Sequence, residues 1–150
     1  MNRKGSSMAV SKSLGSGVRP SPRPTTRTVG GEGEARALAH LQAAGLALVA
    51  RNFKSPGRGG GEVDLIMREP DGTLVFVEVR QRASATHGGA AASVGWAKQR
   101  RIIFAARHFL ARLSNLPPCR FDVVALQGAP DGHAWDVEWL RGAFDASGYS

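Results

Sequence analysis

Apolar and polar positions along the chain recur with two different periods, which separate predicted helices from predicted strands. Residues Glu32 to Ala44 are mostly Ala, Leu, Glu, Arg and Gln, which favour a helix, and Gly45 is a typical helix stop. A second helix is predicted from Trp96 to Leu113, where apolar residues recur at helical spacing on one side. Runs of β-branched, aromatic and other apolar residues predict strands at 46–53, 62–67, 73–80, 121–126 and 134–140.

The order of these elements, α-β-β-β-α-β-(β), predicts an α/β fold in which helices cover a mixed sheet. Pro70-Asp71-Gly72 indicates a turn between the second and third strands, and the glycine-rich stretch 54–61 indicates a loop before the second strand. We expect one globular domain over residues 31–145, followed by a short C-terminal tail at 146–150.

Residues 1–30 are dominated by Ser, Gly, Pro, Thr and Arg, so we predict a disordered basic N-terminal tail. The tail could contact phosphates or could be an extension without a role, and its lack of aromatic residues for base stacking favours the second interpretation. Six of the eight net positive charges lie in this tail, which leaves +2 for residues 31–150. The overall charge is therefore weak evidence for a nucleic acid partner.

Cys119 is the single cysteine, which excludes an intrachain disulfide and a cysteine-rich zinc site. The chain contains no apolar run long enough to form a signal-peptide core or to cross a bilayer. We therefore expect a cytoplasmic protein without a membrane partner.

The main chemical signal is a pair of acidic residues inside apolar strands, Asp64 in the second strand and Glu78 in the third. Burying an ionised carboxylate costs several kcal/mol unless a partner or a metal neutralises it. Strand alternation predicts one shared face for Glu62, Asp64 and Ile66, and another for Leu74, Phe76, Glu78 and Arg80.

Pairing of the two strands about their turn should bring Asp64 close to Glu78. Two converging carboxylates repel each other unless one is protonated or a cation lies between them. Oxygen ligands favour a hard ion, so we predict a Mg²⁺ or Mn²⁺ site completed by waters and the carbonyl of Val79.

Glu34 adds a third acid from the first helix. It lies four and seven residues before Leu38 and Leu41, which places it on the sheet-facing side, where it could hold a second ion or an ordered water. Alternatively, Glu34 only complements the helix dipole, worth about 0.3 to 1 kcal/mol. Glu32 could serve that purpose equally well, which favours a special role for Glu34.

Four ordered motifs resemble the YraN-like family of uncharacterised bacterial proteins, also called uncharacterised protein family 0102: residues 61–66, 76–82, 88–98 and 119–124. The resemblance covers residues 31 to about 145. It implies the restriction-endonuclease-like fold of the PD-(D/E)xK nuclease superfamily and kinship with archaeal Holliday-junction resolvases. By this resemblance Asp64 is the motif aspartate, Glu78 the acid of the (D/E)xK triplet and Glu34 the helical acid. Junction-cutting relatives pair two active sites, so the resemblance also admits a homodimer.

Arg80 departs from the superfamily pattern, which has lysine at this position. Arginine has a pKa above about 12 and cannot act as a base, although it can hold a phosphate. Lys98 could substitute, because it precedes Ile102 by four residues and Ala105 by seven and so borders the sheet. A solvated lysine at a helix start is an equal alternative.

We therefore expect a Mg²⁺- or Mn²⁺-dependent endonuclease that acts on branched or single-stranded DNA, with DNA preferred over RNA. Asp64, Glu78, Arg80 and Lys98 would be catalytic, and the residues expected to contact nucleic acid are Arg58, Arg80, Arg82, Lys98 and Arg101. The basic residues of the second helix could equally form a solvated face. Trp96, Trp135 and Trp139 are most simply core or rim aromatics. The alternatives are a nucleic-acid-binding protein without cleavage and a protein-interaction module.

Overall fold

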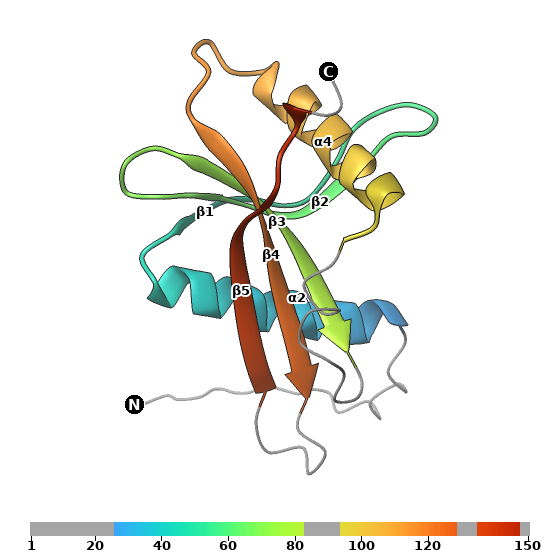
Figure 1. Ribbon diagram of the computed structural model, residues 1–150, viewed down its shortest axis with the longest axis vertical. Helices are drawn as coiled ribbons and strands as arrows, with labels where there is room; N and C mark the ends of the chain where they lie inside the picture. The colour runs from blue at the N-terminus through green and yellow to red at the C-terminus, as the bar shows by residue number, and fades with distance from the viewer. Residues whose placement is uncertain (1–25, 83–93, 129–134, 148–150) are drawn as a thin grey trace, which may run out of the picture.

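The computed structural model describes residues 26–82, 94–128 and 135–147. Five strands form one sheet in the order β1-β2-β3-β4-β5, with a helix before β1 and another between β3 and β4 (Figure 1). Strands β3 and β4 are parallel, and the other neighbouring pairs are antiparallel. The mixed α/β sheet predicted from the sequence is confirmed.

The element bounds are α2 Thr26–Ala43, β1 Ala47–Lys54, β2 Glu62–Arg68, β3 Leu74–Arg82, α4 Trp96–Leu110, β4 Cys119–Gly128 and β5 Trp135–Phe144. Helix α2 begins earlier than the predicted Glu32, and α4 ends earlier than the predicted Leu113. Strands β4 and β5 are longer than predicted because the two strands pair with each other along most of their length. Residues 1–25 of the predicted tail and 148–150 lie outside the described residues.

The two helices pack on opposite faces of the sheet. Alternate residues of β3 show this, because Phe76 packs in a cluster with Ile102 and Phe109 of α4, whereas Val77 packs in a cluster with Leu41 of α2. The α4 side carries the aromatic part of the core, and the α2 side is mainly aliphatic. Glu78, one position beyond Val77, therefore faces α4.

Strand β2 packs side chains on both faces of the sheet. Val63 and Ile66 both pack in the cluster on the α4 side, while Leu65 packs on the α2 side. The paired register with β3 ends at Leu65 opposite Val77. The pairing of β2 with β1 continues in regular register from Ile66 opposite Ala50 to Glu62 opposite Lys54, so the shared face of Glu62, Asp64 and Ile66 stays a prediction.

The loop between β1 and β2 is fixed against α4. The Ser55 side chain accepts a hydrogen bond from the Gly61 N–H at 2.7 Å, and the Ser55 N–H donates to the Gly61 carbonyl at 3.0 Å. A Cβ at Gly61 would lie 1.7 Å from the carbonyl oxygen of Arg101, so only glycine permits this approach. The contact fixes the start of β2, and hence Asp64, relative to α4.

Asp122 joins β4 to β5 through a fully buried carboxylate. It accepts hydrogen bonds from Arg120 Nε at 3.0 Å, Trp139 Nε1 at 2.9 Å and the Gly142 N–H at 2.9 Å. Asp122 thus pairs with the neighbouring Arg120 while its own carboxylate lies in the interior. Its bonds hold the register shift that occurs between Phe121 and Val123.

Candidate functional site

Asp64 and Glu78 meet where β2 and β3 separate. The carboxylate of Asp64 accepts a hydrogen bond from the Val79 N–H at 2.9 Å. In a regular ladder the Val79 N–H would donate to a backbone carbonyl of β2, but here it donates to the Asp64 side chain. The pairing of β2 with β3 accordingly ends at Leu65, the residue next to Asp64. The side chains of Asp64 and Glu78 also lie within hydrogen-bonding reach of each other, with a protonated Glu78 as the donor. The structure thus brings the two predicted acids into direct contact.

Lys98 faces the same site from the first turn of α4. Its Nζ lies 3.7 Å from Oε2 of Glu78, and its side chain is 45% exposed while that of Glu78 is 10% exposed. Of the two interpretations of Lys98, the structure favours the sheet-bordering position over a solvated one. The ammonium group can therefore reach both the buried acid and a ligand in solvent.

The electrostatics of the acidic pair oppose full ionisation. Burial, followed by the charge of Asp64, raises the pKa of Glu78 to about 8, against the favourable charges of Lys98 and Arg80. Burial also raises the pKa of Asp64, although its bond from Val79 opposes the shift. Two such carboxyl groups hold a shared proton unless a cation replaces it.

Glu34 lies near this pair without joining it. Burial and then the charge of Asp64 raise its pKa, and a hydrogen bond with the Asn52 side chain acts in the opposite direction. Glu62 adds a further negative charge that acts on both Glu34 and Asp64. The predicted position of Glu34 on the sheet side of α2 agrees with its partial burial.

The donor set fits a hard divalent cation held by few protein ligands. Oε1 of Glu78 is buried and has no hydrogen-bond partner among the described residues, so an oxygen lone pair is available next to Asp64. Within the same part of the chain, no group of three or more His, Cys, Asp or Glu side chains is close enough to share one ion. Mg²⁺ is commonly held by one or two carboxylates with waters and substrate phosphates, which matches this pair.

Of the remaining predicted site residues, Val79 and Arg80 lie beside the acidic pair, whereas the side chain of Arg82 is not described. Val79 contacts Asp64 through its N–H, and its predicted metal-binding carbonyl stays a prediction. Arg80 is half-buried on β3 and its charge acts on Glu78. Arg82 ends β3, and its side chain lies outside the described residues, as does the motif segment from 88 to 93.

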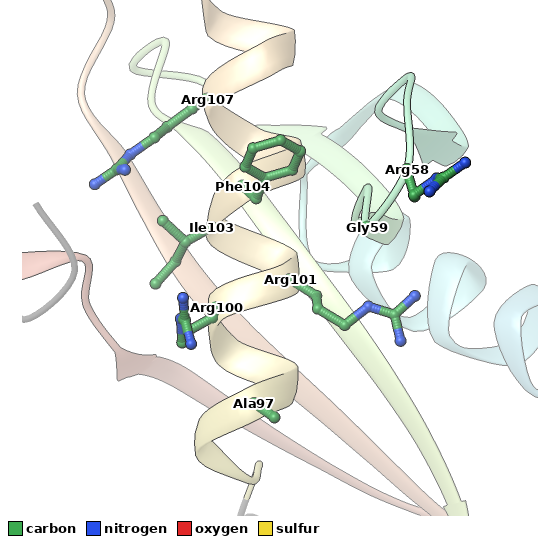
Figure 2. Close-up of a pocket in the computed structure, with 8 residues that line it drawn as sticks. All are labelled: Arg58, Gly59, Ala97, Arg100, Arg101, Ile103, Phe104 and Arg107. Atoms are coloured by element: carbon green, nitrogen blue, oxygen red, sulfur yellow. The ribbon is translucent and has the colours of Figure 1, made fainter.

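A groove of about 510 Å³ runs along α4 beside the loop between β1 and β2. Its lining includes the predicted Arg58 and Arg101 together with Arg100 and Arg107 (Figure 2). The structure therefore brings the loop arginine and the helix arginines together on one surface.

Trp96 and Phe104 on α4, and Asn52 near the acids, were not identified from the sequence as site residues. Trp96 is 65% exposed and Phe104 is 41% exposed, so Trp96 does not lie in the core. Trp135 and Trp139 are partly buried against the α2 side of the core, as expected for rim aromatics. Asn52 has a left-handed φ of 52° beside Glu34, and asparagine's tolerance of this conformation was the only signal.

No helix in the described ranges is both long and apolar enough to cross a membrane.

Comparison with known proteins gives consistent matches. The sequence model of "Uncharacterised protein family UPF0102" matches residues 33–126. A UPF0102 protein of Acidovorax sp. (strain JS42) is 62% identical over 126 residues, which cover 84% of this chain and 91% of the relative. A UPF0102 protein of Polaromonas naphthalenivorans (strain CJ2) is 55% identical over 150 residues, which cover 97% of this chain and 98% of the relative. The matched family region includes Glu34, Asp64, Glu78 and Lys98.

Proposed function

This chain belongs to the uncharacterised protein family UPF0102, the YraN-like family, and from that premise we propose that it is a divalent-metal-dependent endonuclease that hydrolyses phosphodiester bonds in DNA. The observation that supports this most directly is the approach of the half-buried Asp64 to the buried Glu78, whose Oε1 has no hydrogen-bond partner among the described residues. The same two residues occupy the motif positions of the PD-(D/E)xK resemblance. The proposed substrates are branched or single-stranded DNA.

Asp64 and Glu78 would hold Mg²⁺ or Mn²⁺, which when bound supplies polarisation of the phosphate and acidification of a water. Asp64 is oriented for this role by its bond from Val79. Glu34, which is close enough for the charge of Asp64 to act on it, would hold a second ion or a water beside this site.

Lys98 is the cation that would meet the scissile phosphate. Its ammonium is paired with Glu78 yet half-exposed, so it can donate to a phosphoryl oxygen whose charge grows in the transition state. Arg80, which cannot act as a base, would hold an adjacent phosphate. In this proposal Lys98, on α4, stabilises the phosphate charge, a role that the superfamily pattern gives to the lysine at the position of Arg80.

The experiment is a cleavage assay on fluorescent single-stranded, duplex and four-way branched DNA with Mg²⁺, Mn²⁺ or EDTA. We expect metal-dependent cleavage that Asp64→Ala and Glu78→Ala each abolish. Glu32→Ala is the matched control, because this exposed acid pairs only with Arg36 on the outer side of α2 among the described contacts. Unchanged cleavage by the Asp64 and Glu78 variants would contradict the assignment.

Non-catalytic DNA binding is the second candidate, and Arg80 at the usual lysine position is the observation that favours it. Titration of Mg²⁺ followed by calorimetry and thermal unfolding separates the two. An enzyme with this site is stabilised by the ion, since a ligand that binds only the folded state raises its stability. A pure binder shows DNA affinity without metal uptake or products.

A further inference from the structure

We propose that the outward surface of α4 binds the unpaired bases of a single-stranded DNA segment that leads into the acidic site. This inference rests on the proposed function and names the form of substrate that the site would receive. The surface consists of an aromatic-cation stripe, defined as Trp96, Arg100, Phe104 and His108, with flanking arginines.

Aromatic and basic side chains alternate along this stripe at intervals of four residues. Such spacing places them on one face of the helix, one above the other. The Arg100 guanidinium lies over the Trp96 ring at 4.8 Å from its centroid, and the Phe104 and His108 rings are 4.7 Å apart. The stripe is therefore an ordered set of planar groups, and its two largest rings remain exposed.

This exposure is unusual for a helix whose other side is well buried. Ile102, Ala105, Ala106 and Phe109 pack in the core, so the fold does not need Trp96 or Phe104 for its own packing. An exposed tryptophan carries a large apolar area that water solvates poorly. A partner with flat aromatic groups would cover it, and every nucleic acid base has such a face.

The charge around the stripe selects an anionic partner. The sequence has no acidic residue between Glu78 and Asp122, and α4 carries Lys98, Arg100, Arg101 and Arg107 within that interval. Arg58 joins them across the groove. Figure 2 shows Phe104 on the exposed face of α4, with Arg100 and Arg107 projecting on one side and Arg101 on the other, toward Arg58. A ring with cations on both sides, as at Phe104, is the arrangement expected for a stacked base between phosphate contacts.

The stripe begins at the end of α4 that borders the acidic site. Lys98, which contacts Glu78, lies in the first turn of α4 together with Trp96, but it is two residues along and so projects from a different side of the helix. From Lys98 to Arg107 the helix advances about 14 Å, at about 1.5 Å per residue, which is enough for a few nucleotides. A strand held on the stripe would therefore present its phosphates at the end of α4 where Lys98 and the two acids lie.

Paired DNA would use this surface differently. In a duplex the base faces are covered by stacking, so only the arginines would find partners and the exposed rings would contribute little. The rings therefore predict a preference for unpaired over paired DNA that depends on their aromatic faces.

The test measures binding of a fluorescein-labelled 20-mer of dT and of a hairpin duplex of similar length by anisotropy, in EDTA and at low salt. We expect the doubly substituted protein Trp96→Ala/Phe104→Ala to bind the dT oligomer more weakly, by about five- to one-hundred-fold for each ring lost. Its affinity for the duplex should change by less than about twofold. Trp96→Phe should keep most of the single-strand affinity, because it keeps an aromatic face.

Leu116→Ala is the matched control, since Leu116 is 75% exposed but lies outside the stripe. Arg100→Gln should weaken the binding of both the dT oligomer and the duplex. It should also reduce the slope of log K against log salt by about 0.7 for the single strand. Equal losses on both substrates in the aromatic variants, or no preference of the unsubstituted protein for dT, would overturn the proposal. The binding assay contains no divalent ion and so does not depend on cleavage. If the cleavage assay with Mg²⁺ or Mn²⁺ gave no products, the nuclease assignment would be refuted, whereas the measured preference for single-stranded DNA would stand.

Discussion

Replacing Glu78 by glutamine should stabilise the metal-free protein above neutral pH. Burial and the charge of Asp64 raise the pKa of Glu78 from its ordinary 4.5 to about 8. The folded state therefore holds a proton that the unfolded state has already released. Glutamine keeps the shape of this side chain and can donate to Asp64, but it has no charge to lose.

The sign of the pH dependence follows from the raised pKa. The stabilising effect of the proton is complete below about pH 4.5 and is lost as the pH rises through about 8, so metal-free stability falls across this window. At about 1.36 kcal/mol per pKa unit, the ceiling of the loss is about 5 kcal/mol. Water that reaches the ionised pair screens its repulsion, so we expect Glu78→Gln to exceed the unsubstituted protein by about 1 to 3 kcal/mol at pH 8.

The assay is urea unfolding at pH 5, 7 and 8, in EDTA and in Mg²⁺. The unsubstituted protein should lose stability with rising pH in EDTA and recover it in Mg²⁺, whereas Glu78→Gln should show neither change. Glu32→Gln serves as the control, because its exposed pair with Arg36 is worth only a few tenths of a kcal/mol. If Glu78→Gln were less stable than the unsubstituted protein at pH 8 in EDTA, the pair with Lys98 would be structural and the reasoning would be refuted.

Three further substitutions test the framework around the site by the free energy of unfolding in urea. Gly61→Ala should cost about 1 to 3 kcal/mol or more, because the new Cβ would lie 1.7 Å from the Arg101 carbonyl oxygen and must displace the loop or α4. Gly31→Ala should stabilise by about 0.5 to 1 kcal/mol, because it lies within α2 with no heavy atom within 4 Å of the new Cβ. Asp122→Ala should cost about 2 to 5 kcal/mol, because the Trp139 and Gly142 N–H groups lose their buried acceptor while Arg120 keeps its pair with Glu69, and metal binding by the protein that remains folded should be unchanged. A neutral Gly61→Ala, a destabilising Gly31→Ala or a neutral Asp122→Ala would each contradict the local geometry described above.

The sequence contained enough information to predict the helices and strands and to identify Asp64 and Glu78 as site residues. Hydrophobic periodicity separates helices from strands because the faces that pack in the core repeat every 3.6 or two residues. Asp64 and Glu78 were identifiable because ionised groups inside apolar runs are costly and need a partner. The position of Lys98 relative to Ile102 also indicated the correct side of α4, which the contact with Glu78 bears out.

Other features depended on packing between distant segments. The pairing of β2 with β3 ends at Leu65, which leaves the Val79 N–H to the Asp64 carboxylate, and no local pattern in β2 signals this. The requirement for glycine at position 61 comes from the carbonyl of Arg101, forty residues later in the chain. Asn52 enters the site because an unusual backbone conformation in β1 places it beside Glu34.

Sequence alone thus determined which residues must be buried and which charges needed compensation, since these follow from composition and spacing. The tertiary structure decided how these groups are placed: the approach of the two acids to each other, the approach of Lys98 to Glu78, and the exposure of Trp96 and Phe104 on α4. The physical reason is that burial preference belongs to a side chain, whereas distance, desolvation and pKa depend on what the rest of the chain places around it.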